Sequence, residues 1–430
     1  MMKLSIRNFA KILKADIEID GITIIAGNNN IGKSTIGKTL DAVFNATYNI
    51  DEKMNNARID SLSLMLRNEI EQSRYKLNLR IRHFPMRIYN EFAKEILQCK
   101  TEELEEICRK YQEHMSSPSD PESDFIKNVI GYLEENKKIS DEVFSRAIYT
   151  NYFEESFHGE INSLYNKEEL AEIALSIKEK DIRLLFKKDE CIEEKRQFEI
   201  SNNSLYIDDP FVIDEMNHIL TFGISELSIH KRNILRKLFQ KEDKEVEEKA
   251  FSDLLVVNKL EDIIQIIDMV AAGKVVKKQK YMYQFAEDSS KELDVASLST
   301  GVKAFLVLKQ LLLNGNLKDK DVIVLDEPEI HLHPEWQLLY AEIIVLLQKK
   351  FDFHIVVTTH SAHFMEALEL YSKKYKISER CNYYLASMQE NGAIFENVTK
   401  NISKIYKQMV DPTLLLSSLR EELEAEDDEL

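Results

Sequence analysis

Cysteine, proline and long apolar runs are scarce in this sequence. Of 430 residues only 7 are proline and 4 are cysteine, namely Cys99, Cys108, Cys191 and Cys381. Because no two cysteines have the Cys-x-x-Cys spacing, we expect neither a disulfide framework nor a zinc site. The uninterrupted apolar stretches, such as Val322–Leu325, are all far shorter than the roughly 20 residues that cross a bilayer. The N-terminus also lacks the apolar core of a secretory signal, so we expect a cytoplasmic protein with no membrane partner.

Basic residues are outnumbered by acidic ones. The chain has 57 Lys and Arg against 75 Asp and Glu, a formal net charge of −18, while 44% of its residues are hydrophobic. Seven of the acids lie in the last ten residues, Glu421–Leu430. A protein coated in nucleic acid is therefore disfavoured, although a local basic groove remains compatible with the composition. The length predicts either two to three domains or one head with a long insertion.

Two stretches far apart in the sequence predict alternating strands and helices. The first predicts three strands and a helix, at Leu4–Phe9, Ala15–Ile19, Gly21–Ala26 and Thr35–Phe44. The second predicts helices at Val302–Leu313, Glu335–Lys349 and Ala362–Tyr371, separated by strands at Val322–Leu325 and His354–Thr358. This alternation predicts an α/β fold with a mixed, largely parallel sheet and flanking helices.

The residues between these stretches are rich in Glu, Lys, Ile and Leu. Their pattern is mostly helical, for example over Glu102–Met115 and Lys167–Phe186, whereas Phe198–Ile207 is compatible with a pair of strands. No heptad pattern is sustained, which favours a compact helical arm over a long coiled coil. The expected domains are a first lobe over 1–48, a mainly helical insertion over 49–290, a second lobe over 291–400, and a C-terminal helix and acidic tail over 401–430.

A glycine-bounded loop joins the third strand to the first helix. Its sequence, Gly27-Asn28-Asn29-Asn30-Ile31-Gly32-Lys33-Ser34, satisfies G-x-x-x-x-G-K-[ST] in the strand–loop–helix context that this motif requires. Backbone N–H groups of such a loop surround phosphate oxygens, Lys33 can reach the β- and γ-phosphates, and the Ser34 hydroxyl can bind Mg²⁺. Asn30 can take up a positive φ more readily than most residues. The motif predicts that residues 27–35, including Thr35, bind ATP with Mg²⁺.

Two acids follow the strand Val322–Leu325. In open α/β sheets ligands bind at the carboxyl ends of the strands, which is where Asp326 and Glu327 stand. We expect Asp326 to hold Mg²⁺ and Glu327 to orient the attacking water. His360 follows the next strand and could contact a γ-phosphate, although a structural histidine is the common alternative.

A further motif opens the helix Val302–Leu313. Ser299 and Gly301 stand at the N-terminus of this helix, where unpaired N–H groups and the helix dipole favour a phosphate. Local physics alone favours a plain N-cap over an anion site, and both interpretations stay open.

In this order the four motifs resemble the nucleotide-binding head of ABC-type ATPases. The segment Asp326–Gln337 further resembles the overcoming-lysogenization-defect (OLD) group and its relatives in bacterial phage-defence systems. The resemblance implies that Ser299 and Gly301 close over ATP bound to a second subunit, in a homodimer or a higher homo-oligomer. OLD nucleases carry a nuclease domain after the ATPase, and the residues after His360 are too few for one. A nuclease or toxin effector is therefore expected to be a separately encoded partner.

Three functions remain open. The first is an ATPase in antiviral defence that engages double-stranded DNA, or another phage-derived feature, and controls the effector. The second is an ATP-gated scaffold with slow turnover that holds a toxin or nuclease inactive. The third is a transporter subunit, which the long separation between Lys33 and Ser299 disfavours. Three basic clusters are candidates for DNA contact or for solvated surface, and they are Lys76, Arg80, Arg82 and Arg87; Lys231, Arg232, Arg236 and Lys237; and Lys274, Lys277, Lys278 and Lys280.

Overall fold

The chain forms two compact units. The computed structural model describes residues 2–76, 84–100, 102–115, 122–137, 139–222, 227–239, 246–409 and 418–420. Unit 1 contains Met1–Tyr48 and Tyr149–Leu430, and unit 2 contains Asn49–Ile148. Arg80 and Arg82 of the first basic cluster and the acidic tail Glu421–Leu430 lie outside the described residues. Within those residues, no helix is both long and apolar enough to cross a membrane.

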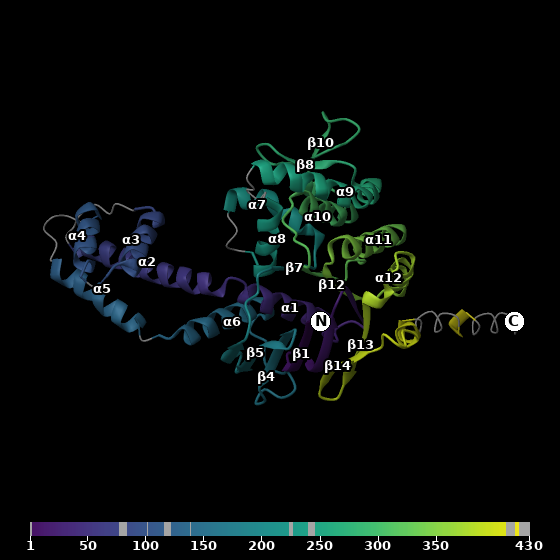
Figure 1. Cartoon of the computed structure of the whole chain (residues 1–430), viewed down its shortest axis with the longest axis horizontal. Coiled ribbons are helices and arrows are strands. Elements are labelled where there is room, and N and C mark those ends of the chain that lie inside the picture. Colours follow the sequence, from purple (N-terminus) through teal and green to yellow (C-terminus); the bar gives the residue numbers. More distant parts are fainter. Residues whose placement is uncertain are drawn as a thin grey trace, which may run out of the picture. The chain divides into compact units, whose positions relative to one another are not determined.

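The centre of unit 1 is an eleven-stranded mixed sheet with the order β6-β5-β4-β1-β2-β14-β13-β3-β12-β11-β7. Its strands are β1 (Met2–Phe9), β2 (Ile12–Ile19), β3 (Ile22–Ala26), β4 (Ala171–Ile177), β5 (Lys180–Lys187), β6 (Glu190–Arg196), β7 (Ser204–Ile207), β11 (Val322–Asp326), β12 (His354–Thr359), β13 (Cys381–Gln389) and β14 (Gly392–Asn397). Pairing is parallel from β13 through β3, β12 and β11 to β7 and antiparallel from β6 to β2. The N-terminal strands are purple in Figure 1, and in the sheet β1 and β2 lie between β4 and β14 while β3 lies between β13 and β12. The α/β class with a mixed sheet is confirmed.

Helices cover both faces of the parallel half of the sheet. They are α1 (Lys33–Thr47), α7 (Glu215–Phe222), α8 (Ile229–Phe239), α9 (Val246–Ala271), α10 (Thr300–Leu313), α11 (Pro334–Phe351) and α12 (Ala362–Lys374). Ile323 and Leu325 of β11 belong to the hydrophobic core that α9 to α12 complete. Val324 lies between them in sequence and packs against Gly37 of α1. Since successive strand residues point to opposite faces, α1 covers the other side of β11.

Shorter elements complete unit 1. Among the described residues, 3₁₀ turns lie at Pro210–Ile213, Val295–Ser297 and Ser378–Arg380. A small antiparallel sheet is made of β8 (Lys274–Lys277), β9 (Tyr281–Gln284) and β10 (Glu292–Asp294). Residues 403–409 are helical, within the segment where a C-terminal helix is expected.

The helical prediction for Lys167–Phe186 is wrong. This segment forms strands β4 and β5, in which alternate residues such as Ile173, Leu175, Ile182 and Leu184 are buried. Burial with a period of two stabilises a strand, but apolar residues at the outward positions, Ala174 and Leu185, obscure that period in the sequence. Within Phe198–Ile207 only Ser204–Ile207 is a strand. The helical insertion is consequently narrower than 49–290, because residues 171–207 contribute strands to the main sheet.

Unit 2 is helical. It contains α2 (Ile50–Lys76), α3 (Met86–Gln98), α4 (Leu104–Met115), α5 (Glu122–Lys137) and the first half of α6 (Asp141–Phe157). Its core combines Leu62 and Leu66 of α2 with Phe92 of α3, Cys108 of α4 and Val129 of α5. Phe92 stacks on the Tyr111 ring with centroids 4.1 Å apart. The helix expected at Glu102–Met115 is confirmed as α4, and its apolar positions recur at helical spacing.

The two places where the chain passes between unit 1 and unit 2 are close together within unit 1. Thr47, the last residue of α1, and Tyr149, where unit 1 resumes, share a hydrogen bond of 2.9 Å between their hydroxyl groups. Both side chains are buried. Unit 2 is therefore inserted between two residues that are in contact inside unit 1.

Candidate functional site

The loop between β3 and α1 has the conformation that phosphate-binding loops need. Asn30 has a φ of 66° and Gly32, which caps α1, a φ of 86°, so both take the left-handed conformation. The positive φ that asparagine tolerates is thus observed at Asn30. The buried Lys33 ammonium donates hydrogen bonds to the carbonyl oxygens of Gly27 (3.0 Å) and Asn28 (2.9 Å). The loop therefore holds one cation directly beneath its backbone.

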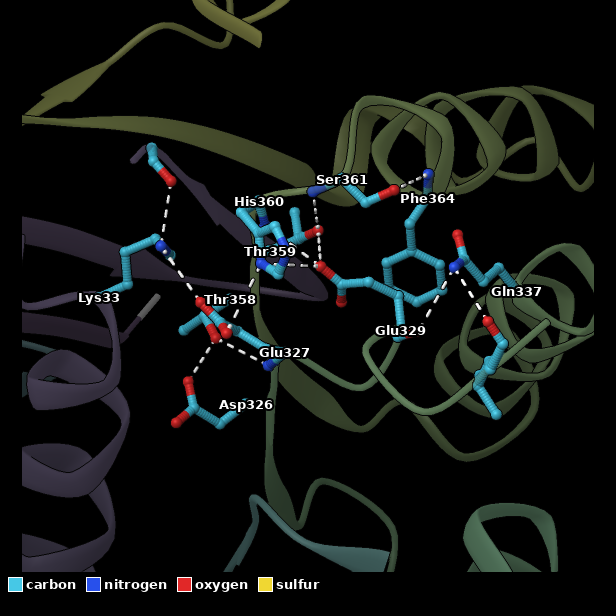
Figure 2. A network of polar contacts seen from close by, with 12 residues as sticks. Lys33, Asp326, Glu327, Glu329, Gln337, Thr358, Thr359, His360, Ser361 and Phe364 are labelled. Carbon is cyan, nitrogen blue, oxygen red and sulfur yellow. Dashed lines mark hydrogen bonds and ion pairs between the residues drawn. The ribbon is translucent and has the colours of Figure 1, made fainter. Parts of the chain in front are cut away.

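Two carboxylates meet this lysine from the end of β11. Glu327 Oε1 lies 3.2 Å from Lys33 Nζ, and Figure 2 shows the two side chains pointing toward each other. The Glu327 backbone has a φ of 49°, and its N–H donates to the Thr358 hydroxyl of the neighbouring strand at 3.0 Å. The Thr358 hydroxyl in turn donates to Asp326. The pairing of β11 with β12 thus fixes both acids at the carboxyl edge of the sheet.

Tyr206 is a site residue that the sequence did not reveal. It lies on β7, next to β11, and its buried hydroxyl donates a hydrogen bond to Asp326 Oδ2. Burial, together with the negative charge of Asp326, raises the pKa of the Tyr206 hydroxyl well above its ordinary value, so this group stays a donor. Its only sequence signal is the short apolar run Ser204–Ile207, which does not disclose the strand it pairs with.

His360 lies between two glutamates. Its Nδ1 atom is 3.5 Å from Glu327 Oε2 and 3.7 Å from Glu329 Oε1 (Figure 2). Glu329 is 2% exposed and accepts hydrogen bonds from the Thr359 hydroxyl (2.5 Å) and the His360 N–H (3.1 Å). Burial raises the pKa of the Glu329 carboxyl. The structure therefore brings Lys33, Asp326, Glu327 and His360 together. Glu329 also belongs to this group, although the sequence predicts no role for it.

Ser299 and Gly301 stand at the N-terminus of helix α10. Ser299 occupies the N-cap position, but its side chain makes no capping hydrogen bond. A Cβ atom on Gly301 would come within 2.7 Å of the Trp336 ring, so only glycine allows α10 and α11 to approach this closely. Neither residue is among those that line the cavity at the phosphate-binding loop.

A cavity of about 240 Å³ opens beside the loop. The residues that line it are Ala10, Lys11, Asn30, Gly32, Lys33, Ser34, Thr35, Phe157, Glu160, Leu164 and Glu327. Ser34 and Thr35, for which the sequence predicts binding of ATP with Mg²⁺, thus both lie at this cavity. Other residues of the predicted loop do not line this cavity. Asn28 and Asn29 are exposed to solvent, and Ile31 is buried against the rest of unit 1.

A phosphate-binding loop above a buried acidic strand, with a histidine at the end of the next strand, defines a P-loop ATPase head whose motifs follow the ABC order. The chain belongs to the AAA ATPase domain family, which matches residues 1–365. It is therefore an ATPase, with nucleotide binding assigned to unit 1.

Part of this sequence is similar to curated proteins, among them the following two. A probable ATPase of retron Ec83 from Escherichia coli is 31% identical over 124 residues, which cover 26% of this chain and 22% of that protein. The Septu protein PtuA from Bacillus thuringiensis is 27% identical over 172 residues, which cover 37% of this chain and 41% of that protein. The chain thus matches less than half the length of either relative.

Solved structures of SMC head domains are also similar. One from Thermotoga maritima has a TM-score of 0.38 at 12% identity and covers 92% of this chain and 98% of that one. One from Pyrococcus furiosus, bound to a domain of ScpA, has a TM-score of 0.40 at 14% identity and covers 95% and 100%.

Proposed function

We propose that this ATPase is a regulator in anti-phage defence that works on a separately encoded nuclease or toxin. The observation that supports the ATP chemistry is the meeting of Lys33, Glu327 and His360 at one edge of the sheet. The defence role rests on the partial similarity to the retron and Septu proteins and on the resemblance of Asp326–Gln337 to the OLD group. OLD membership itself remains part of the proposal.

The pairing of Lys33 with Glu327 suggests how ATP primes the site. Both charges are largely buried, with side-chain exposures of 3% and 22%, so they neutralise each other without nucleotide. Phosphate oxygens of ATP would take over the Lys33 ammonium and leave Glu327 free to accept a proton from the attacking water. His360 Nδ1, held near Glu327, would then face the γ-phosphate.

Magnesium fits the oxygen donors at this site. The Ser34 hydroxyl and the Asp326 carboxylate are hard ligands of the kind that Mg²⁺ prefers, and they stand on α1 and β11 beside Lys33. When bound, the ion would neutralise charge on the β- and γ-phosphates. Tyr206 and Thr358, which donate to the two Asp326 oxygens, would hold the carboxylate in place for it.

A second copy of the chain would complete each ATP site. The Ser299 hydroxyl is not used in capping α10, which leaves it available to a phosphate. The cavity of about 240 Å³ is also small compared with the roughly 300 to 1,000 Å³ of most ligand sites. Both observations favour a head-to-tail homodimer in which Ser299 and Gly301 of one subunit cover the ATP held by the other.

Ion pairs of the basic residues help to choose among the three basic clusters as a DNA-binding surface. In the second basic cluster, Lys231 pairs with Asp209 (3.4 Å) and Arg232 pairs with Glu155, so these cations are engaged inside unit 1. In the third cluster the lysines of the β8–β9 hairpin are exposed, with one of them, Lys278, bound to Glu292. We therefore favour this hairpin over the first and second basic clusters as the contact for DNA phosphates.

Steady-state ATP hydrolysis with and without double-stranded DNA tests this function. Turnover should depend on Glu327 and be lost in Glu327→Gln, while DNA should raise it several-fold at low salt and less at high salt. The matched variant Lys277→Gln should lower the stimulation without lowering the basal rate. Turnover that depends on Glu327 but ignores DNA would reject DNA engagement and favour the slow ATP-gated scaffold. Turnover unchanged by Glu327→Gln would reject the assigned chemistry.

A further inference from the structure

Helix α6 ends beside the nucleotide cavity. After Phe157 the chain turns through His158 (φ 53°) and Gly159 (φ 76°), and the Gly159 N–H donates back to the Glu154 carbonyl at 3.2 Å. This left-handed closure ends the helix and directs residues 160–164 away from its axis. No sequence motif marks this segment, which we call the wall (Phe157–Leu164).

The wall is fastened to the phosphate-binding loop through the turn between β1 and β2. The Ala10 N–H donates to the Ile161 carbonyl and the Leu164 N–H donates to the Ala10 carbonyl, both at 2.9 Å. The next residue of the turn, Lys11, donates to the Asn30 side chain of the loop. The wall and the loop are thus joined through one short turn.

A buried part of the wall is also tied to the turn between β5 and β6. The Asp189 carboxylate accepts hydrogen bonds from the N–H groups of Ile161 (2.9 Å) and Asn162 (2.8 Å). The Asn162 side chain in turn accepts from the Asp189 N–H at 2.9 Å. These contacts satisfy the wall's backbone within the protein, so the wall is formed before any ligand binds.

Three wall side chains line the same cavity as Lys33 and Ser34, and they are Phe157, Glu160 and Leu164. Lysine, hydroxyl and backbone N–H groups on the loop side suit phosphate oxygens. A carboxylate on the wall side would repel phosphate, but it accepts hydrogen bonds from ribose hydroxyls or from an exocyclic amine. Leu164 keeps 40% of its surface exposed, an apolar face suited to cover a base.

We propose that the wall binds the nucleoside end of the nucleotide, with Glu160 accepting hydrogen bonds from the nucleoside and Leu164 packing on its base. The inference rests on the proposed ATP site and adds the residues that distinguish a nucleoside triphosphate from a bare polyphosphate. Nucleotide preference is then set by a segment far in sequence from the phosphate-binding loop.

Calorimetry of the full chain with Mg-ATP and with inorganic triphosphate tests this assignment. Glu160→Ala and Leu164→Ala should each weaken ATP binding by about three- to tenfold and leave triphosphate binding unchanged or, for Glu160→Ala, stronger. The control variants Glu168→Ala and Leu170→Ala alter exposed side chains of the following segment, and Leu170 is 41% exposed, like Leu164. The controls should change neither affinity.

Lys33→Ala separates the two proposals, because it should weaken both ligands if the loop is the phosphate site. Equal loss of ATP and triphosphate in the wall variants would overturn the nucleoside assignment and leave the loop assignment intact, as would unchanged ATP affinity in both variants. Unchanged binding of both ligands in Lys33→Ala would instead reject the ATP site itself. Thermal unfolding of each variant, followed by Trp336 fluorescence, confirms that unit 1 remains folded.

Discussion

Asp41 should make the stability of unit 1 depend on pH. This carboxyl lies in the middle of α1, fully enclosed, and accepts hydrogen bonds from the Ser204 hydroxyl (2.6 Å) and the Asn45 amide (2.7 Å). Burial raises its pKa from 3.8 to about 7, an effect that these two hydrogen bonds and the nearby His230 only partly oppose and that Asp208 increases. Near neutral pH, folding therefore has to accommodate a charge that prefers water.

The direction and size of the change in unfolding free energy follow from the pKa of Asp41 in the unfolded chain, 3.8, and in the folded chain, about 7. Below pH 3.8 the carboxyl is protonated in both the folded and the unfolded chain, and its contribution to stability is fully present. As the pH rises through 3.8 toward 7, the unfolded chain releases this proton first, and stability is lost. At about 1.4 kcal/mol per pH unit the full loss is about 4 kcal/mol, of which roughly 2 to 3 kcal/mol falls between pH 5 and pH 8.

The assay is urea unfolding followed by tryptophan fluorescence. Trp336, the single tryptophan, lies on α11 in unit 1, so the signal reports the unit that contains Asp41. Asp41→Asn is neutral at every pH, and its free energy of unfolding should fall between pH 5 and pH 8 by roughly 2 to 3 kcal/mol less than that of the wild type. The exposed Asp319→Asn is the control and should follow the wild type. Parallel curves for wild type and Asp41→Asn would refute the reasoning.

Three further predictions concern the site and unit 2. Tyr206→Phe should raise the Mg²⁺ concentration for half-maximal turnover several-fold, whereas Tyr340→Phe, which removes a buried hydroxyl from α11, should not; equal Mg²⁺ curves would contradict the role of the Tyr206 hydroxyl. Glu329→Ala removes the acceptor of the Thr359 hydroxyl and the His360 N–H, and it should lower kcat about tenfold with little change in KM. Glu329→Gln still accepts these hydrogen bonds and should retain most of the activity. A change confined to KM would argue that Glu329 does not position His360. Phe92→Ala should destabilise unit 2 by about 3 to 5 kcal/mol, which should speed hydrogen exchange of the amides in α2 and α3. A smaller rise in the exchange rate would show that the core of unit 2 repacks around the missing ring.

The parts of the fold that local signals determine were predictable from the sequence. The phosphate-binding loop is marked by its glycines, and the helix after it by an amphipathic run, so α1 and the strand before it match expectation. The acids after β11 are marked by the end of an apolar run. In each case the residues that carry the signal are neighbours in the chain.

The missed parts depend on contacts between distant residues. The alternation in strands β4 and β5 is blurred by apolar residues at the outward positions, such as Ala174 and Leu185, and the strands form because β4 pairs with β1 and β5 pairs with β4. Tyr206 reaches Asp326 only because β7 pairs with β11 across 120 residues of sequence. Glu329 lies inside the segment Asp326–Gln337, yet its contact with the β12–α12 turn follows from packing and not from spacing.

The hydrogen bond between Thr47 and Tyr149 has a consequence for how this architecture can change. Because the chain departs and returns at residues already in contact, excising everything between them and bridging the gap with a few flexible residues adds almost no closure entropy to the head. Unit 2 can therefore be lengthened, shortened or replaced while the main sheet of unit 1 keeps its strand pairing. Changes of length or sequence in unit 2 can thus accumulate while the sheet that positions Lys33 and Glu327 is conserved.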